Sequence, residues 1–178
     1  MQPAVFLDRD GVLNHTEVIN GKPYAPIRVE DFKILPGTFK ALNTLKNSGF
    51  ALAVITNQPD VGNGKVKKEI VAQMNADLIS KLPIDTIKVC YHAQTDGCDC
   101  RKPKPGLIYE AAAEMQIDPL KSYMIGDRWS DISAGKAAGC TTILVDYNYS
   151  ENFVDQPDFK VASLPAAVDT IILQNMDI

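Results

Sequence analysis

Long hydrophobic runs and an excess of basic charge are both missing from this chain of 178 residues. No apolar stretch approaches the roughly 18 residues that cross a membrane, and the first residues lack the basic region of a secretory signal. The 18 basic and 22 acidic residues give a formal net charge of −4, whereas nucleic-acid-binding surfaces are normally basic. We therefore expect a cytoplasmic protein without a membrane or nucleic-acid partner.

Histidine, tryptophan and cysteine are scarce, with two, one and four residues respectively. In a cytosolic chain, cysteines are more typical of reduced thiols or metal ligands than of disulfides. Hydrophobic residues make up 46% of the chain, as in ordinary globular proteins. This length and composition predict one domain over residues 1–178, and the lack of an extended exposed apolar pattern favours a monomer.

Short apolar runs rich in β-forming residues alternate with helical patterns along the chain. The expected strands are 4–7, 51–56, 86–90, 122–125 and 141–145. The expected helices are 38–47, 65–81, 105–115, 130–138 and 165–173. Strand–helix alternation implies right-handed crossovers and a parallel sheet with helices on both faces. We predict a doubly wound, Rossmann-like α/β fold with about five to six strands.

Polar residues follow several of these strands at the edge where such sheets bind ligands, beyond the carboxyl ends of the strands. They are Asp8 and Asp10 after the first strand, Thr56, Asn57 and Gln58 at the second, Asp127 and Arg128 after the fourth, and Arg101 and Lys102 before the helix that precedes the fourth. Four separate segments thus converge on one edge, which predicts a single polar site. We expect Asn57 and Gln58 to contact the substrate there.

Asp8 and Asp10 flank one residue and are followed by Gly11. Unpaired carboxylates at the end of a buried strand are costly to desolvate, and a divalent cation is the usual partner of such oxygen ligands. A carboxylate that faces a phosphate can also attack it as a nucleophile. The alternative is a polar turn that uses Asp and Gly only for their backbone preferences.

No insertion long enough to form a large cap domain interrupts the chain. The site is then shaped by the turn after Thr56, by the cysteine-rich segment and by residues 14–31, which are long for a connection between a strand and a helix. Such an open site suits a small phosphorylated metabolite. His15 lies in this long connection, and we expect it to be a loop residue rather than a catalytic base.

The polar segments resemble the four motifs of the haloacid dehalogenase superfamily in order and context, over nearly the whole chain. The motif residues are Asp8-Arg9-Asp10-Gly11, Thr56, Lys102 and the run from Gly126 to Asp131. The resemblance implies a Mg²⁺-dependent phosphatase that works through an aspartyl-phosphate. It implies Asp8 as the nucleophile, Asp10 as the general acid and base, and Mg²⁺ ligation by Asp8, Asp127 and the backbone carbonyl of Asp10.

The same resemblance assigns the remaining motif residues. It implies that Thr56 hydrogen-bonds a phosphoryl oxygen and that Lys102 neutralises charge on the transferring group. Gly11 lets the backbone turn close to the phosphate. Arg128 is expected either to contact a substrate phosphate or to cap local backbone groups. Asp131 has two open interpretations, as a support for the metal ligands or as an acid that favours a helix N-terminus.

Three of the four cysteines and one of the two histidines fall within eleven residues. They are Cys90, His92, Cys98 and Cys100. Three thiolates and one imidazole suit a tetrahedral structural Zn²⁺, with residues 90–100 as the zinc loop. Loop cysteines with an incidental histidine, or a disulfide, are the alternatives. The remaining Cys140 is expected to be a small buried hydrophobic residue.

The cysteine cluster leads directly into Arg101 and Lys102, so closing the zinc loop would hold these two cations over the phosphate-binding edge. The arrangement CxH…CxCRKP resembles the zinc loop of two phosphatase groups, the D-glycero-D-manno-heptose 1,7-bisphosphate phosphatases and the histidinol-phosphate phosphatase domains. The resemblance implies that Zn²⁺ is structural, that Mg²⁺ is catalytic and that Arg101 takes part in substrate recognition.

Two sets of features favour different substrates. The segments 8–14, 30–32, 35–37 and 56–58 resemble the heptose group, which favours removal of the 7-phosphate of D-glycero-D-manno-heptose 1,7-bisphosphate. The short interval from His92 to Cys98 resembles the histidinol-phosphate group. The turn 59–64 also lacks the basic residue often found in the heptose group, a place that Lys65 could fill. Another sugar or polyol phosphate, or a non-catalytic zinc-stabilised binding module, are the remaining alternatives.

Overall fold

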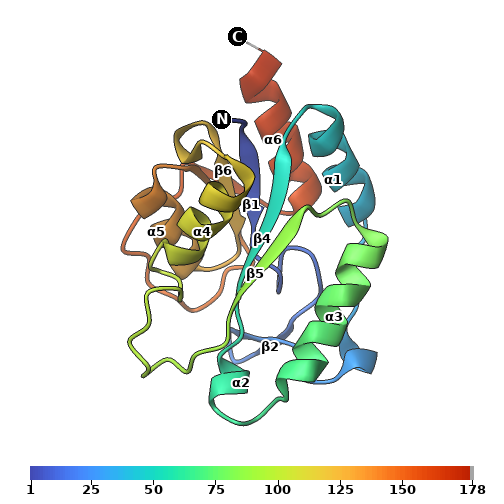
Figure 1. Ribbon diagram of the computed structural model, residues 1–178, viewed down its shortest axis with the longest axis vertical. Coiled ribbons are helices and arrows are strands. Elements are labelled where there is room, and N and C mark those ends of the chain that lie inside the picture. The colour runs from blue at the N-terminus through green and yellow to red at the C-terminus, as the bar shows by residue number, and fades with distance from the viewer. Residues whose placement is uncertain (177–178) are drawn as a thin grey trace.

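The computed structural model describes residues 1–176, in which strands and helices alternate (Figure 1). The strands of the main sheet are β1 (Ala4–Leu7), β4 (Ala51–Asn57), β5 (Thr86–Cys90), β6 (Tyr123–Gly126), β7 (Thr141–Val145) and β8 (Phe159–Val161). The α-helices are α1 (Thr38–Asn47), α2 (Pro59–Gly62), α3 (Lys68–Lys81), α4 (Gly106–Met115), α5 (Trp129–Ala138) and α6 (Leu164–Met176). The other elements are the strands β2 (Glu17–Ile19) and β3 (Lys22–Tyr24) and the 3-10 turns η1 (Val29–Asp31) and η2 (Pro119–Lys121).

The main sheet has the strand order β5-β4-β1-β6-β7-β8, and every neighbouring pair is parallel. In the central strand β1, Val5 pairs with Leu52 of β4 on one side and with Tyr123 of β6 on the other. The predicted doubly wound parallel sheet is confirmed. Because β1 lies inside the sheet, the residues after Leu7 emerge between the ends of β4 and β6.

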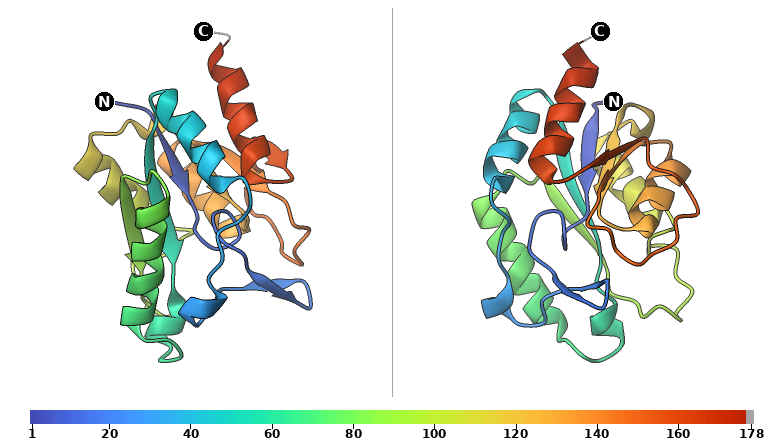
Figure 2. Two further views of the ribbon diagram at one scale, coloured as in Figure 1. Left: turned by 90° about the vertical axis from the view of Figure 1, so that its right-hand side faces the viewer. Right: turned by 180° about the vertical axis from the view of Figure 1, so that it is seen from behind.

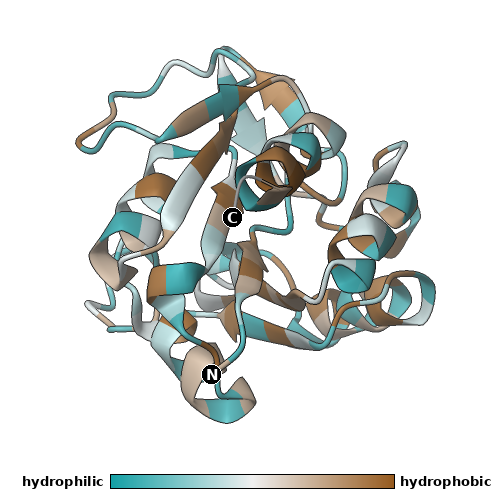
Figure 3. Ribbon diagram, turned by 90° about the horizontal axis from the view of Figure 1, so that it is seen from above, coloured by the Kyte–Doolittle hydropathy of each residue, from teal (hydrophilic) through white to brown (hydrophobic). Residues whose placement is uncertain are grey.

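Helices cover both faces of the sheet, as Figure 2 shows. Successive residues of a strand point to opposite faces, so Val5 and Leu7 pack in a core with α1, α3 and α6, whereas Ala4 and Phe6 pack in a second core with α4 and α5. The helices carry both hydrophobic and hydrophilic residues (Figure 3). Burial of the central strand on both faces explains why its sequence is continuously apolar.

Several short elements were missing from the sequence-based expectation: the hairpin β2–β3, the one-turn helix α2, the edge strand β8 and the 3-10 turns η1 and η2. The hairpin lacks a buried apolar face, because its residues are exposed or only half-buried. Its turn residues Asn20 and Gly21 both have positive φ, at 51° and 74°. Asn-Gly is a characteristic hairpin-turn pair and is the signal that could have identified this element.

Helix α3 begins at Lys68, three residues later than the prediction, because residues 63–67 form the turn after α2. None of the helices within residues 1–176 is long and apolar enough to cross a membrane. The prediction of one domain over residues 1–178 extends to positions 177 and 178, which lie outside the described residues, and it stays a prediction.

Candidate active site

The ends of β1, β4 and β6 meet at a cleft of about 560 Å³. The predicted site residues that line it are Asp8, Asp10, Asn57, Gln58, Arg101, Lys102, Asp127 and Arg128. The structure therefore brings together residues from all four predicted segments. His15 has an exposed side chain and belongs to the loop before β2, in agreement with the expectation that it is a loop residue.

Three carboxylates form a compact cluster at the base of this cleft. Asp8, Asp127 and Asp131 each place one oxygen so that the three atoms lie within 4.8 Å of one another, and all three residues are buried. The Oδ1 atom of Asp127 is buried and has no hydrogen-bond partner among residues 1–176. Burial, followed by the charges of Asp8 and Asp131, raises the pKa of Asp127 well above its usual value. A hard cation with oxygen ligands would relieve this repulsion, so the cluster fits Mg²⁺.

Lys102 places a positive charge directly against this carboxylate cluster. Its Nζ lies 2.8 Å from Asp8 Oδ1 and 2.6 Å from Asp131 Oδ1, and it donates to the carbonyl of Ile55 at 2.7 Å. Burial alone lowers the pKa of Lys102, but Asp131 and Asp8 outweigh it and the net pKa is raised. Burial and Asp131 raise the pKa of Asp8 to about 7, although Lys102 opposes them. Lys102 thus remains charged next to the predicted nucleophile.

Asp10 is oriented by a separate set of hydrogen bonds. Its two carboxylate oxygens accept from the Arg9 guanidinium at 3.0 Å, Asn14 Nδ2 at 2.9 Å and Gln58 Nε2 at 2.7 Å. The side chain is outside the cluster of three carboxylates, and the predicted metal ligand is its backbone carbonyl. A carboxyl group that lines the cleft without joining the metal cluster is suited to acid–base chemistry.

Two polar residues at the end of β4 hold other site residues in place. Gln58 Nε2 donates to Thr56 Oγ1 at 3.0 Å as well as to Asp10, and Thr56 is fully buried. Asn57 accepts from the Lys102 backbone N–H and donates to its carbonyl, both at 3.1 Å. The structure therefore shows Asn57 and Gln58 as supports of Lys102 and Asp10. The predicted contacts of Asn57, Gln58 and Thr56 with a substrate stay predictions.

Gly11 is required for a reason that the sequence did not reveal. Its φ is +84°, and a Cβ atom at this position would lie 2.0 Å from Asp127 Oδ2. Both the left-handed conformation and the close approach exclude a side chain. The backbone thus turns tightly against the Asp127 carboxylate, while the predicted approach of Gly11 to a phosphate stays a prediction.

Asp131 combines both roles that the sequence left open. It belongs to the carboxylate cluster and pairs with Lys102, and its Oδ2 also accepts from the Arg128 backbone N–H at 3.0 Å at the start of α5. The Arg128 guanidinium pairs with the carboxylate of Glu151, with its Nε 2.7 Å from Oε1. Contact between Arg128 and a substrate phosphate stays a prediction.

Sequence reasoning missed Tyr149 and Glu151, which lie in the segment after β7. The Tyr149 hydroxyl donates to Asp127 Oδ2 at 2.9 Å, and burial together with the charge of Asp127 raises the pKa of Tyr149. The signal available in the sequence was positional, because β7 is parallel to β1 and its carboxyl end points to the same edge. Residues after β7 are therefore candidates for the site in the same way as those after β1, β4 and β6.

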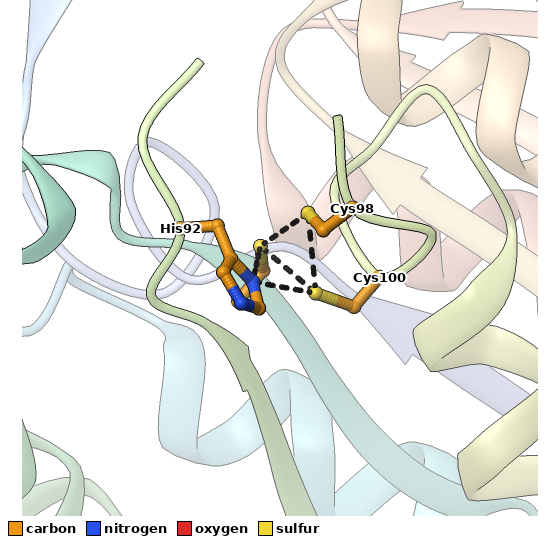
Figure 4. Close-up of side chains that lie close together, drawn as sticks. His92, Cys98 and Cys100 are labelled. Carbon is orange, nitrogen blue, oxygen red and sulfur yellow. Dashed lines mark hydrogen bonds between the residues drawn. The ribbon is translucent and has the colours of Figure 1, made fainter. Parts of the chain in front are cut away.

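The predicted zinc ligands converge as expected. Figure 4 shows the ring of His92 and the sulfur atoms of Cys98 and Cys100 turned toward one point. Cys100 Sγ lies 3.1 Å from Cys90 Sγ, 3.5 Å from Cys98 Sγ and 3.2 Å from His92 Nδ1. Zn–S bonds of about 2.3 Å in a tetrahedron place ligand atoms roughly 3.7 Å apart, so a slight widening of the cluster would bring these distances to those of a zinc site.

The chemistry of the donor set also fits Zn²⁺. All four cysteines are free thiols. Burial, followed by the neighbouring Cys90 and Cys98 thiols, raises the pKa of Cys100 to about 12. Crowded thiols cannot all ionise without a cation, whereas a coordinated thiol is deprotonated. Three sulfurs and one imidazole nitrogen therefore form a set that Zn²⁺ would satisfy, while Cys140 is buried and does not belong to this set.

The cysteine loop passes directly into the cleft through Arg101 and Lys102. Arg101 lines the cleft, and its Nη1 is buried without a hydrogen-bond partner among residues 1–176. Lys102 is fixed independently by Asn57 and Ile55. The loop therefore ends in Lys102, which is held by hydrogen bonds, and Arg101, whose guanidinium group has an N–H donor that is free within the described residues. A free donor of this kind is suited to binding an anion.

The fold and the arrangement of these residues define a phosphoryl-transfer type of site, and comparison with known proteins agrees. The chain belongs to the haloacid dehalogenase-like hydrolase family, whose sequence profile matches residues 7–139. Over 158 residues it is 37% identical to the D-glycero-beta-D-manno-heptose-1,7-bisphosphate 7-phosphatase of Pasteurella multocida, covering 82% of each chain. The enzyme of the same name from Escherichia coli K12 is 34% identical over 184 residues, covering 93% of each chain.

Solved structures show the same fold. The D,D-heptose 1,7-bisphosphate phosphatase from B. bronchiseptica, complexed with magnesium and phosphate, superposes with a TM-score of 0.82 at 23% identity, covering 97% of this chain and 99% of the other. The corresponding protein from Burkholderia thailandensis has a TM-score of 0.66 at 21% identity, covering 96% and 99%. The predicted absence of a large cap agrees with this near-complete overlap.

Proposed function

We propose that this chain is a Mg²⁺-dependent phosphatase that removes the 7-phosphate of D-glycero-D-manno-heptose 1,7-bisphosphate. The observation that carries the proposal is the Asp8 carboxylate, which ends β1 in the cleft, pairs with Lys102 and belongs to the buried carboxylate cluster. The names of relatives that are 34–37% identical over most of the chain support the substrate.

In the first step, an Asp8 carboxylate oxygen attacks the phosphorus atom. A new bond forms between phosphorus and Asp8, and the bond between phosphorus and the sugar oxygen breaks. Asp10 donates a proton to that leaving oxygen, which becomes the sugar hydroxyl. Lys102 stays next to Asp8 and offsets negative charge on the transferring group. Bound Mg²⁺ would supply further charge neutralisation, held by Asp8, Asp127 and the Asp10 carbonyl.

In the second step, water attacks the phosphorus atom of the aspartyl-phosphate. Asp10, now ionised, takes one proton from that water, and the bond between phosphorus and Asp8 breaks to release phosphate. Both carboxyl groups thereby return to their starting states. The hydrogen bonds from Arg9, Asn14 and Gln58 hold Asp10 for both proton transfers.

The lining of the cleft supports a phosphorylated sugar as the substrate class. Besides the carboxylates it includes Lys65, Gln94 and Arg101, which together offer two cations and an amide. A sugar that carries a second phosphate matches this pattern, because the distant group needs positive charge and the hydroxyls need hydrogen-bond partners. We propose Arg101 and Arg128 as further substrate contacts, with the chain acting as a single-domain cytoplasmic monomer.

The test is phosphate release from D-glycero-D-manno-heptose 1,7-bisphosphate and from histidinol phosphate, each measured with and without Mg²⁺. We expect turnover of the heptose bisphosphate with the larger kcat/KM and a requirement for Mg²⁺. A preference for histidinol phosphate would assign the chain to the histidinol-phosphate phosphatases. The short interval from His92 to Cys98 would then be the better indicator of the substrate. Absence of turnover for every phosphate ester tested would support a non-catalytic binding module.

A further inference from the structure

The segment that follows β7 folds back over the carboxylate cluster, and Tyr149 is its point of contact. Its hydroxyl donates to Asp127 Oδ2 at 2.9 Å. The other oxygen of the same carboxylate, Oδ1, is buried and has no hydrogen-bond partner among residues 1–176. One oxygen of Asp127 is therefore occupied by Tyr149, and the other is left for a cation.

The Asp127 carboxylate is confined on a second side by the backbone. A Cβ atom at Gly11 would lie 2.0 Å from Oδ2 and 2.6 Å from Cγ of Asp127. The backbone at Gly11 thus limits the movement of the Asp127 carboxylate on one side, and the Tyr149 hydroxyl fixes the rotation of this carboxylate. A carboxylate held in this way presents Oδ1 in one fixed orientation.

Tyr149 is itself held in place by several contacts of its segment. Its ring stacks on the ring of Tyr147, with centroids 5.6 Å apart. The Ser150 backbone N–H donates to the carbonyl of Gly21 in the β2–β3 turn at 2.9 Å. Glu151 pairs with the guanidinium of Arg128. These anchors lie on both sides of Tyr149, so the position of its hydroxyl is set by the fold.

We propose that Tyr149 is a positioning residue for the catalytic metal, acting through Asp127. The inference rests on the proposed function in one respect, namely that Asp127 is a Mg²⁺ ligand. Hydrogen bonds from outer residues orient metal-binding carboxylates, and their loss typically costs about 10- to 100-fold in metal affinity or activity. Tyr149 does not touch the reacting atoms in this scheme, and its contribution is the angle at which Asp127 meets the ion.

The relative affinities for Mg²⁺ and Ca²⁺ distinguish a positioning role of Tyr149 from a merely structural one. Mg²⁺ demands near-ideal octahedral geometry at short distances, whereas Ca²⁺ accepts variable geometry at longer ones. A carboxylate that can rotate therefore penalises Mg²⁺ more than Ca²⁺. General loosening of the segment after β7 would weaken both ions alike.

The experiment is isothermal titration calorimetry of Mg²⁺ and, separately, Ca²⁺ into the whole zinc-loaded protein. The proteins are the wild type, Tyr149→Phe, Tyr147→Phe and Asp127→Asn. Tyr149→Phe keeps the ring and its stacking on Tyr147 but removes the donor. Thermal unfolding of the zinc-loaded proteins without Mg²⁺ or Ca²⁺ verifies that each variant is folded. Tyr147→Phe is the matched control, because it removes a hydroxyl from the stacked neighbour.

We expect Tyr149→Phe to raise the Kd for Mg²⁺ by about tenfold and the Kd for Ca²⁺ by less than about threefold. Tyr147→Phe should bind both ions like the wild type. An unchanged Kd for Mg²⁺ in Tyr149→Phe, or equal losses for both ions, would overturn the role of Tyr149 and leave the metal site intact. Lack of Mg²⁺ binding by the wild type, or undiminished binding by Asp127→Asn, would instead overturn the metal site of the proposed function, and the role of Tyr149 with it.

Discussion

The two candidate metal-binding clusters of this molecule are built in opposite ways. The carboxylate cluster draws Asp8 from the end of β1, Asp127 from the end of β6 and Asp131 from the first turn of α5, and all three are buried. The thiol–imidazole cluster draws its ligands from residues 90–100, and three of its four residues are partly or fully exposed. The first cluster is positioned by two separate strands and a helix, and the second by the end of β5 and the loop that follows it.

This difference has a consequence for how much each cluster needs its ion. Lys102 and Tyr149 hold the carboxylates through contacts of 2.6–2.9 Å. The thiol side chains instead contact one another and His92. We therefore expect the Mg²⁺ site to govern catalysis with little effect on the fold, and the Zn²⁺ site to govern the local fold.

The largest effect is expected for Asp8→Asn. This nearly isosteric change removes the nucleophile, so kcat should fall by at least about 10⁴-fold, as for other enzymes that lose a covalent nucleophile. Far-ultraviolet circular dichroism should remain that of the wild type. The control is Asp77→Asn on the surface of α3, which should keep full activity. Residual turnover within about tenfold of the wild type would exclude Asp8 as the nucleophile.

Removing one thiol should have a smaller effect on rate but a larger one on stability. We expect Cys98→Ser to lower the zinc content measured by atomic absorption and to lower Tm by roughly 10 °C, because each kcal/mol corresponds to about 2–4 °C in a chain of this length and structural zinc contributes folding free energy directly. Activity should fall less than in Asp8→Asn, since Asn57 still holds Lys102.

Cys140→Ala is the matched control for this change, because Cys140 is buried and is not one of the four clustered ligands. It should retain the zinc content of the wild type. Full zinc occupancy in Cys98→Ser would contradict the assigned ligand set, and a loss of activity as large as in Asp8→Asn would erase the distinction between the two clusters.

A third test uses the pH dependence of the carboxylate cluster. Burial, followed by Asp131, raises the pKa of Asp8 from 3.8 to about 7, so the folded metal-free protein holds a proton that the unfolded chain releases. The resulting stabilisation is present below the unfolded pKa and is lost as pH rises through the folded pKa. Mg²⁺ competes with this proton, so its stabilising effect should grow over the same range.

The measurement is the increase in Tm on adding Mg²⁺, which should be markedly larger at about pH 8 than at about pH 5.5. Asp8→Asn should reduce this dependence on pH. Equal increases at both pH values would show that Asp8 does not exchange a proton for the metal.

The smallest effect is expected for Lys104→Ala, next to the thiol cluster. Lys104 pairs with Asp99 at 2.8 Å, but the Asp99 side chain is 96% exposed. Exposed ion pairs contribute little to stability, so zinc content and Tm should stay within error of the wild type. A measurable loss of zinc would mean that the loop depends on its surface charges as well as on its metal ligands.

The contrast between the clusters also explains what could be predicted from the sequence. Cys90, His92, Cys98 and Cys100 are close in the chain, so their spacing alone indicated a cluster. Asp8, Lys102 and Asp127 are far apart in the chain, but each lies next to an apolar strand or a recognisable motif, and the rule that strand ends share one edge brought them together. The alternation of strands and helices was sufficient for the parallel sheet.

The features of the site that were not predicted from the sequence depend on contacts between distant segments, which no local sequence pattern encodes. The amide of Asn57 pairs with the backbone of Lys102. The Asp127 carboxylate leaves no room for a side chain at position 11. Tyr149 reaches Asp127 from a segment with no apolar periodicity. Each of these depends on how separate segments fold over one another, and a sequence without a structure gives no distance between them.

The central claim is that Asp8 carries the phosphoryl group during turnover, and it is tested most directly by trapping that species. The enzyme is mixed with D-glycero-D-manno-heptose 1,7-bisphosphate and Mg²⁺, quenched rapidly in acid, digested and examined by mass spectrometry. We predict that the peptide containing Asp8 gains the mass of one phosphoryl group and that Asp8→Asn does not. Steady turnover without any such modified peptide, or a phosphoryl group on a different residue, would contradict the account.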